Sequence, residues 1–167
     1  KPVSLNFGGL IGETYGAKFK NDSLVLNVSL KNSNFPQETF KFGGFVGNAF
    51  GKIFVDDVTV SGNIESLEEI SQEEMPYTPI YLGGILGSAD GDTIIINNAK
   101  ISSNFKFSYI NPSELFVGSA IGYVYATTLN MQNVTYDGEI SFEISSSDNI
   151  SLGGFVGIYS TPEYNYN

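Results

Sequence analysis

Clustered carboxylates are the residues of this chain whose type and spacing could do chemistry. Between positions 65 and 74 lie Glu65, Glu68, Glu69, Glu73 and Glu74. Carboxylate oxygens are the ligands that Ca²⁺ prefers, so Glu68, Glu69, Glu73 and Glu74 are candidate metal ligands. A solvated acidic loop is the competing interpretation, because runs of like charge usually face water. The sequence predicts no cofactor other than calcium at this loop.

Two further acidic pairs are explained better by a structural role than by metal binding or catalysis. Asp90-Gly91-Asp92 is similar to the start of a calcium loop, but the glutamate expected at its twelfth position is absent. Asp56 and Asp57 could be taken for a catalytic carboxylate pair. They occupy a position at which other parts of the chain carry asparagine and glutamine, so we expect a turn there.

The composition argues against catalysis. The chain has no histidine and no cysteine, and all eight of its basic residues are lysines. The common proton shuttle, thiol nucleophile and guanidinium clamp are therefore missing. We predict no enzyme and no catalytic residues. A carboxylate-based glycosidase or lyase is the remaining enzymatic alternative, and it would need two carboxylates about 5–10 Å apart in a cleft.

Four aromatic side chains, expected beside the loops or in an outward column, are the candidate binding residues. They are Tyr77, Tyr81, Tyr109 and Phe116. Aromatic faces with polar tips suit stacking on sugars or packing at a protein interface. Alternatively, these rings support strand pairing through contacts between neighbouring strands. Both interpretations remain open at the level of the sequence.

Four asparagines lie in N-x-S/T sequons and are glycosylation candidates: Asn21, Asn27, Asn133 and Asn149. Asn149 lies in an expected short loop and would be the most accessible acceptor of a secreted protein. Asn133 lies at an expected turn, where its neighbours would hinder it.

A five-residue glycine phrase recurs along the chain and must help to position these residues. It reads GGLIG, GGFVG, GGILG, GSAIG and GGFVG, and it begins at positions 8, 43, 83, 118 and 153, so the steps are 35, 40, 35 and 35 residues. Such a period is typical of proteins whose units bury their apolar faces by stacking. Glycine permits a sharp bend or a close approach. The glycines assigned this structural role are Gly8, Gly9, Gly12, Gly43, Gly44, Gly47, Gly83, Gly84, Gly87, Gly118, Gly122, Gly153, Gly154 and Gly157.

Alternating apolar residues surround each phrase and predict strands. An apolar–x–apolar triplet precedes each phrase, as in Phe40-Lys41-Phe42, and its middle member should face solvent. Further apolar pairs follow around a two-residue polar turn, read as Asp22-Ser23, Asp56-Asp57, Asn97-Asn98 and Gln132-Asn133. Side chains at such turns could bond to their equivalents in adjacent units. We therefore predict an all-β fold, a β-solenoid of about four stacked repeats with roughly three short strands each.

The segment GGFVGNAFGKIFVDDVTVSGNI at 43–64 best shows a family resemblance. Its order of glycines, alternating apolar residues and polar turn resembles the GLUG repeats of bacterial and protist surface proteins. The resemblance covers about 20 residues of each period. It implies a secreted, adhesin-like protein of β-helical character. The chain departs from the pattern at GSAIG, which lacks the second glycine.

Charge and hydropathy limit the partners. With 18 acidic and 8 basic residues the formal charge is −10, which should repel nucleic acid and anionic lipid. No apolar run approaches the roughly 18 residues of a membrane span. We therefore expect neither nucleic acid nor a membrane span. The resemblance to GLUG repeats implies a location outside the cell or on its surface, and the acidic composition agrees with it.

The pattern indicates one domain over residues 1–167. Repeat units are expected at about 5–39, 40–79, 80–114 and 115–149, with a fifth unit starting at 150–160 and a polar tail at 161–167. No capping unit is evident, so we expect a fragment of a longer array.

Two classes of function remain. The first is a structural stalk, layer or filament that associates end to end or continues in further repeats of the same chain. The second is an adhesin that binds a glycan or a host surface protein through aligned loops at 31–39, 65–79, 108–114 and 145–149.

Overall fold

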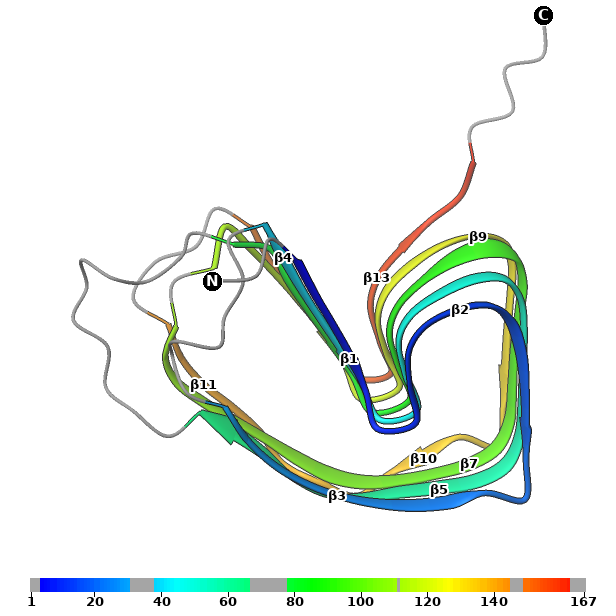
Figure 1. Ribbon diagram of the computed structural model, residues 1–167, viewed down its shortest axis with the longest axis horizontal. Coiled ribbons are helices and arrows are strands. Elements are labelled where there is room, and N and C mark those ends of the chain that lie inside the picture. The colour runs from blue at the N-terminus through cyan, green and yellow to red at the C-terminus, as the bar shows by residue number, and fades with distance from the viewer. Residues whose placement is uncertain (1–3, 31–37, 67–77, 111, 145–148, 163–167) are drawn as a thin grey trace, which may run out of the picture.

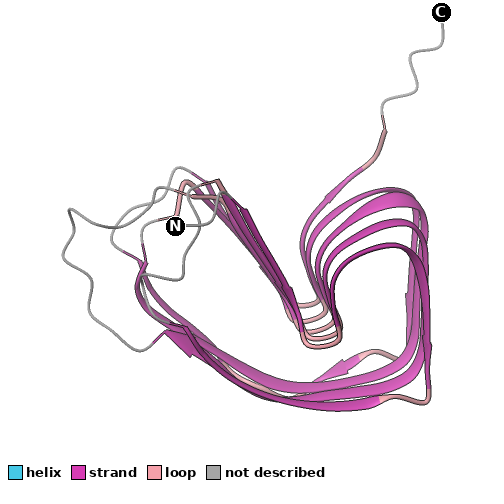
Figure 2. Cartoon of the chain, in the orientation of Figure 1, coloured by secondary structure: helices cyan, strands magenta, loops and turns pink. Residues whose placement is uncertain are grey.

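The chain folds as an all-β protein. The computed structural model describes residues 4–30, 38–66, 78–110, 112–144 and 149–162. Every regular element in these ranges is a strand (Figure 2). The thirteen strands are β1 Ser4–Gly8, β2 Ile11–Lys20, β3 Ser23–Leu30, β4 Thr39–Gly43, β5 Val46–Ser66, β6 Ile80–Gly83, β7 Leu86–Ile110, β8 Glu114–Gly118, β9 Ile121–Gln132, β10 Thr135–Tyr136, β11 Ile140–Ile144, β12 Asn149–Gly153 and β13 Val156–Ser160.

These strands form two parallel sheets. The first has five strands in the order β1-β4-β6-β8-β12, and the second has eight, with β13-β9-β7-β5-β2 as its main path. Equivalent positions of the glycine phrase pair with one another, so that Gly43 lies opposite Gly8 and Gly83. Figure 1 shows the successive passes of the chain one behind another. We call these passes layers: layer 1 is β1–β3, layer 2 β4–β5, layer 3 β6–β7, layer 4 β8–β11 and layer 5 β12–β13.

The predicted fold class is wrong. Instead of a β-solenoid of about four repeats with three short strands each, the described residues form thirteen strands in sheets of five and eight. Two of these strands are long, with 21 residues in β5 and 25 in β7. Corner residues such as Asp57 and Asn98 turn the chain while its pairing with neighbouring strands continues on both sides. Segments expected to be separate strands are therefore continuous.

Two apolar clusters fill the interior. The outer members of the triplets in layers 2 to 4 are buried, as the alternation predicts: Phe40, Phe42 and Leu82 pack with Phe105 and Phe107 of β7. A second cluster lies within the other sheet and includes Val46, Ile53, Val55, Val58, Val60 and their equivalents in layers 3 and 4. Parallel strands pair well here because each strand presents apolar residues at the same position as its neighbours.

The last glycine of each phrase lets the two sheets touch. A Cβ atom added to Gly47 would lie 2.6 Å from the backbone nitrogen of Phe7 and 2.8 Å from the carbonyl carbon of Asn6. These atoms belong to β1, the strand of the preceding layer. Any side chain at this position would therefore separate the second sheet from the first.

The polar corners form a column of left-handed residues. Asn21, Asp57, Asn98 and Asn133 have φ angles of 57°, 53°, 52° and 53°, a conformation that asparagine and aspartate tolerate best after glycine. The Asn98 amide donates to Asp56 Oδ1 at 3.0 Å and accepts a bond from Asn133 at 3.0 Å.

The first corner lies two residues before its predicted position. Lys20 pairs with Asp56, so Lys20-Asn21 is the corner of layer 1. Ser23, predicted to lie in that turn, instead begins strand β3, because the turn must fall where the neighbouring layer turns.

Substitutions at Asn98 can separate the cost of backbone strain from the cost of losing side-chain hydrogen bonds. Asn98→Ala loses two amide bonds and forces alanine into the left-handed region, so we expect a loss of about 2–3 kcal/mol of unfolding free energy. Asn98→Gly removes the same bonds without the strain and should cost about 1 kcal/mol. Denaturant unfolding followed by circular dichroism measures both changes.

Asn104→Ala is the matched control. Asn104 also makes two side-chain bonds, to Asn63 and from the backbone nitrogen of Glu139, but its φ is not positive. It should resemble Asn98→Gly. Equal losses for alanine and glycine at position 98 would contradict the strain argument.

Candidate functional site

The seam between the two sheets brings together chemically distinct side chains. Middle residues of the triplets on the first sheet face residues that follow the glycine phrase on the second sheet. The seam consists of Asn6, Glu13, Lys41, Asn48, Tyr81, Phe116 and Tyr123. The prediction that the middle triplet residues face solvent is wrong, since Phe116 is only 4% exposed and Lys41 and Tyr81 are half-buried. The second sheet covers this face because the glycines allow it to approach.

The seam is polar in layers 1 and 2. The Asn6 amide donates to Glu13 Oε2 at 2.9 Å, and the Asn48 amide donates to the same oxygen at 3.1 Å. The Lys41 ammonium donates to Asn48 Oδ1 at 3.1 Å. Asn48 therefore links a cation to a carboxylate across two layers. Burial lowers the pKa of Lys41, and the carboxylates of Glu13 and Asp90 offset part of this effect.

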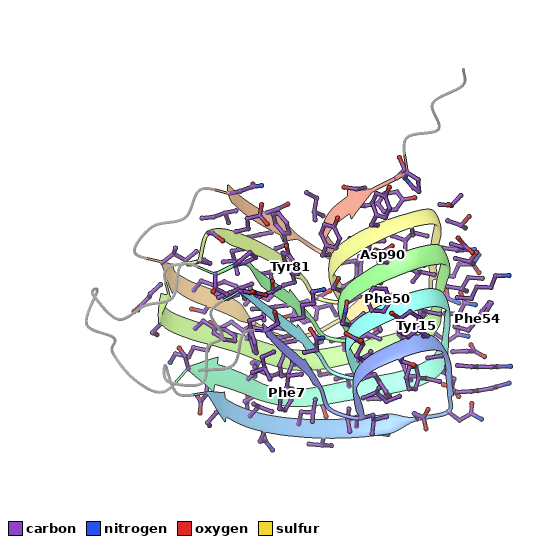
Figure 3. All side chains as sticks on the ribbon, turned by 45° about the horizontal axis from the view of Figure 1, so that its top comes forward. Phe7, Tyr15, Phe50, Phe54, Tyr81 and Asp90 are labelled. Atoms are coloured by element: carbon purple, nitrogen blue, oxygen red, sulfur yellow. The ribbon has the colours of Figure 1, made fainter. Side chains whose placement is uncertain are left out.

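The seam is aromatic in layers 3 and 4. The Tyr81 ring stacks on Phe116 with centroids 5.3 Å apart and on Tyr123 at 5.3 Å. The Tyr81 hydroxyl donates to Glu114 Oε2 at 3.2 Å. Burial, followed by the nearby Glu114 carboxylate, raises the pKa of Tyr81 above its ordinary value. Figure 3 shows Tyr81 on the first sheet, with Asp90 on the second sheet across from it.

Two predicted binding residues thus lie together, but their ring faces contact other rings. Tyr81 and Phe116 are register partners on β6 and β8, so their stacking follows from the parallel pairing. Sequence reasoning missed Tyr123, their third partner. The sequence contained a signal for Tyr123, because this residue directly follows the last glycine of GSAIG. It lies in register with Ser88, which has the same position in layer 3.

The remaining binding and metal candidates are Tyr77, Tyr109 and four glutamates. Tyr77 and the glutamates Glu68, Glu69, Glu73 and Glu74 lie outside the described residues. Tyr109 belongs to β7, but its side chain is outside the described part. In the described ranges, no three histidine, cysteine, aspartate or glutamate side chains are grouped to hold a metal ion.

The acidic pairs considered for chemistry lie in strands. Asp56 accepts an amide bond at the corner of β5, and Asp57 has the left-handed corner conformation. Asp90 and Asp92 are exposed on β7. The segments 65–66 and 108–110, expected in loops, also belong to strands, namely β5 and β7.

All four sequon asparagines are exposed. Asn21 and Asn133 lie at corners, and Asn133 donates its amide to Asn98. Asn27 lies on β3 and accepts a bond from Asn63 at 3.4 Å. Asn149 is the first residue of β12 rather than part of a loop.

The two end layers carry most of the large exposed apolar side chains. Layer 1 exposes Leu10, Tyr15 and Val25, and Tyr15 is 81% exposed. Layer 5 exposes Ile150, Leu152, Phe155 and Tyr159. Elsewhere in the described part only Phe54 and Tyr125 belong to this class, each 37% exposed. Strands β1 and β12 are also the edges of the first sheet, and β2 and β13 are the ends of the main path of the second.

A shallow hollow lies on the outer face of the second sheet. Its volume is about 170 Å³, and it is lined by Asn63, Ile64, Glu65, Asn104, Phe105, Lys106, Glu139 and Ser141. The amides of Asn27, Asn63 and Asn104 form a hydrogen-bonded ladder beside it. Amides, carboxylates and an ammonium group offer both donors and acceptors to a polar ligand.

Comparisons with protein-family models, curated proteins and solved structures find no match. The GLUG resemblance therefore stays an expectation from the sequence. Among the described residues, no helix is long and apolar enough to cross a membrane.

The environment of Tyr81 predicts a pH dependence of stability. Its folded pKa is raised above the unfolded value of about 10, so the neutral ring stabilises the fold fully below pH 10. This contribution is lost as pH rises from 10 through the folded pKa. Tyr81→Phe should therefore flatten the fall of unfolding free energy above pH 10, and should cost about 1 kcal/mol at pH 7 through the lost bond to Glu114.

Urea unfolding between pH 7 and pH 12 measures this slope. Tyr15→Phe, at an exposed ring that stacks on Phe50, is the control and should keep the slope of the parent chain. An unchanged slope for Tyr81→Phe would show that this hydroxyl does not couple ionisation to folding.

Proposed function

We propose that this protein is a structural module that assembles end to end, outside the cell or on its surface. The observation that carries the proposal is the distribution of exposed apolar side chains, which lie mainly on the first and last layers. Such clusters, combined with unpaired strand edges, are typical of surfaces that pair with another strand.

The burial of side chains in the inner layers also supports end-to-end assembly. In layers 2 to 4 the equivalents of Leu10 and Phe155 are covered by layers on both sides: Phe45, Ile85 and Ala120 are fully buried, whereas Leu10 and Phe155 are exposed. Adding a layer at either end would bury these two side chains as well. Burial of a large apolar side chain stabilises by roughly 1.5–3 kcal/mol.

Contacts between unlike ends generate open chains when the rotation from one copy to the next does not close a ring. The proposed product is therefore a stalk or filament whose repeat is one copy of the chain. The formal charge of −10 would keep separate filaments apart and disfavours nucleic acid and anionic lipid as partners. The surface location rests on this charge and on the resemblance to GLUG repeats.

The proposed assembly needs no cofactor. Its contacts are apolar and backbone–backbone, so a chelator should not dissolve it. Calcium remains a proposal restricted to the glutamates at 68–74.

Sedimentation velocity over a concentration series tests the assembly. We expect larger species as the concentration rises, with and without EDTA. Leu10→Gln and Leu152→Gln each remove an exposed apolar side chain at one end and should weaken association at least tenfold, which corresponds to about 1.4 kcal/mol.

Phe54→Gln is the matched control, because Phe54 is an exposed apolar residue of layer 2, which is covered by layers on both sides and is not an end layer. It should associate like the parent chain. A chain that stays monomeric at every concentration, or equal effects of all three substitutions, would contradict end-to-end assembly.

A second candidate function is adhesion to a glycan, favoured by the hollow on the second sheet. Its amides, carboxylates and Lys106 could bond several hydroxyl groups of a sugar. Lys106→Ala should then weaken binding at least tenfold to oligosaccharides retained on an array of neutral and acidic glycans. Lys100→Ala, on the same strand but outside the hollow, should bind normally. Equal binding by both variants would remove this candidate.

A further inference from the structure

The second glycine of the phrase is required by the layer that follows it. A Cβ atom added to Gly9, Gly44 or Gly84 would collide with the carbonyl oxygen of Gly44, Gly84 or Ser119, respectively. A Cβ atom added to Gly154 would meet nothing within 4 Å. No contact in the described structure therefore requires glycine at position 154.

The last glycine of the phrase is required by the layer that precedes it. Cβ atoms added to Gly47, Gly87, Gly122 and Gly157 would lie 2.6, 2.6, 2.5 and 2.7 Å from backbone nitrogens of the preceding layer. At Gly12 the nearest atom is instead Asn6 O of its own layer, at 2.9 Å. The first layer therefore also keeps a glycine whose usual partner layer is absent from the structure.

These two glycines complement each other. In the described part of the chain no layer follows Gly154 and none precedes Gly12, and a second copy of the chain would supply both. We propose that layer 5 of one copy seats on layer 1 of a second copy in the register that continues the parallel pairing. This inference rests on the proposed function and specifies its interface.

The internal pairing defines the register. Gly118 pairs with Gly153, Val117 with Leu152 and Leu115 with Ile150. Continued by one layer, Gly153 faces Gly8, Leu152 faces Phe7 and Ile150 faces Leu5 of the second copy. The exposed Leu10 and Phe155 then occupy the column in which Phe45 and Ile85 are buried.

The extent of the contact follows from the strands of the end layers. Layer 5 consists of β12 and β13, which run over Asn149–Gly153 and Val156–Ser160. These two strands meet β1 and the first half of β2 of the second copy, whereas β3 has no counterpart. The glycine phrase and its flanking strands therefore make the contact by themselves, as in the addition of a strand to a sheet edge.

Ser119 shows what the second position tolerates. This serine replaces the second glycine in layer 4, and its hydroxyl donates to the carbonyl oxygen of Gly154. A small side chain that can hydrogen-bond is thus accommodated between layers. The test therefore uses valine, which is larger and has no hydroxyl.

A peptide with the sequence of residues 4–16, SLNFGGLIGETYG, tests the interface apart from the rest of the second copy. Labelled with a fluorophore, it should bind the full chain in an anisotropy titration. Gly154→Val in the chain should weaken this binding at least tenfold while leaving thermal unfolding unchanged, because the added side chain enters open space.

The peptide carries its own matched control. Gly12→Val places a side chain against the backbone of layer 5 and should abolish binding. Gly9→Val places one on the opposite side, where a further layer would lie, and should bind like the parent peptide. Equal effects of the two peptide substitutions would overturn the register, as expected for a symmetric pairing of two β12 edges.

Sedimentation separates failure of this inference from failure of the proposed function. If the chain associates with rising concentration but Gly154→Val associates equally well and the peptide does not bind, the register is wrong and end-to-end assembly stands. If the chain stays monomeric and the peptide does not bind, both are wrong. Association that is lost in Gly154→Val, together with peptide binding, supports both.

Discussion

The close approach of two backbones at each glycine phrase is the constraint on which the rest of the structure depends. Gly47 lies so near Phe7 of the preceding layer that a single carbon atom would push the sheets apart. The bend that results folds the first sheet back along the second (Figure 1). Because equivalent glycines recur at matched register, every layer bends at the same place and the strands of the first sheet pair without offset. In the second sheet the register shifts at bulges, as between Phe50 and Lys52.

In-register pairing then sets what each side chain can contact. Equivalent positions in successive layers are direct neighbours, so rings stack on rings and amides bond to amides, as in Tyr81 on Phe116 and Asn104 on Asn63. Side chains in such a column contact or hydrogen-bond to one another. Little ring surface is therefore left free on the sides of the stacked layers. The free surface is at the ends, where each column lacks its next member. This is why the ends carry the proposed function rather than the aromatic seam.

The seam contains both polar and aromatic side chains that are at least half-buried. Lys41 is half-buried beside its register partner Tyr81, and Asn48 connects its ammonium by hydrogen bonds to the exposed carboxylate of Glu13, so that the half-buried charge has a hydrogen-bond partner. Parallel stacking thus accommodates a charged layer directly beside an aromatic one. The cost is a lowered pKa of Lys41 and raised pKa values of Tyr81 and Tyr123.

The sequence by itself determined the strands, the inward faces of the triplets such as Phe40 and Phe42, and the importance of the glycine phrases, because alternation and glycine spacing are local properties. It did not determine strand length, since β5 and β7 continue through corners that look like turns. It also misplaced the first corner at Asp22-Ser23, because only pairing with Asp56 sets that position. The partners of Tyr81 and the cover over Phe116 were decided by tertiary structure alone. Two sheets must meet before a face can be assigned to solvent or to a seam, and that meeting depends on contacts between layers about 35 residues apart.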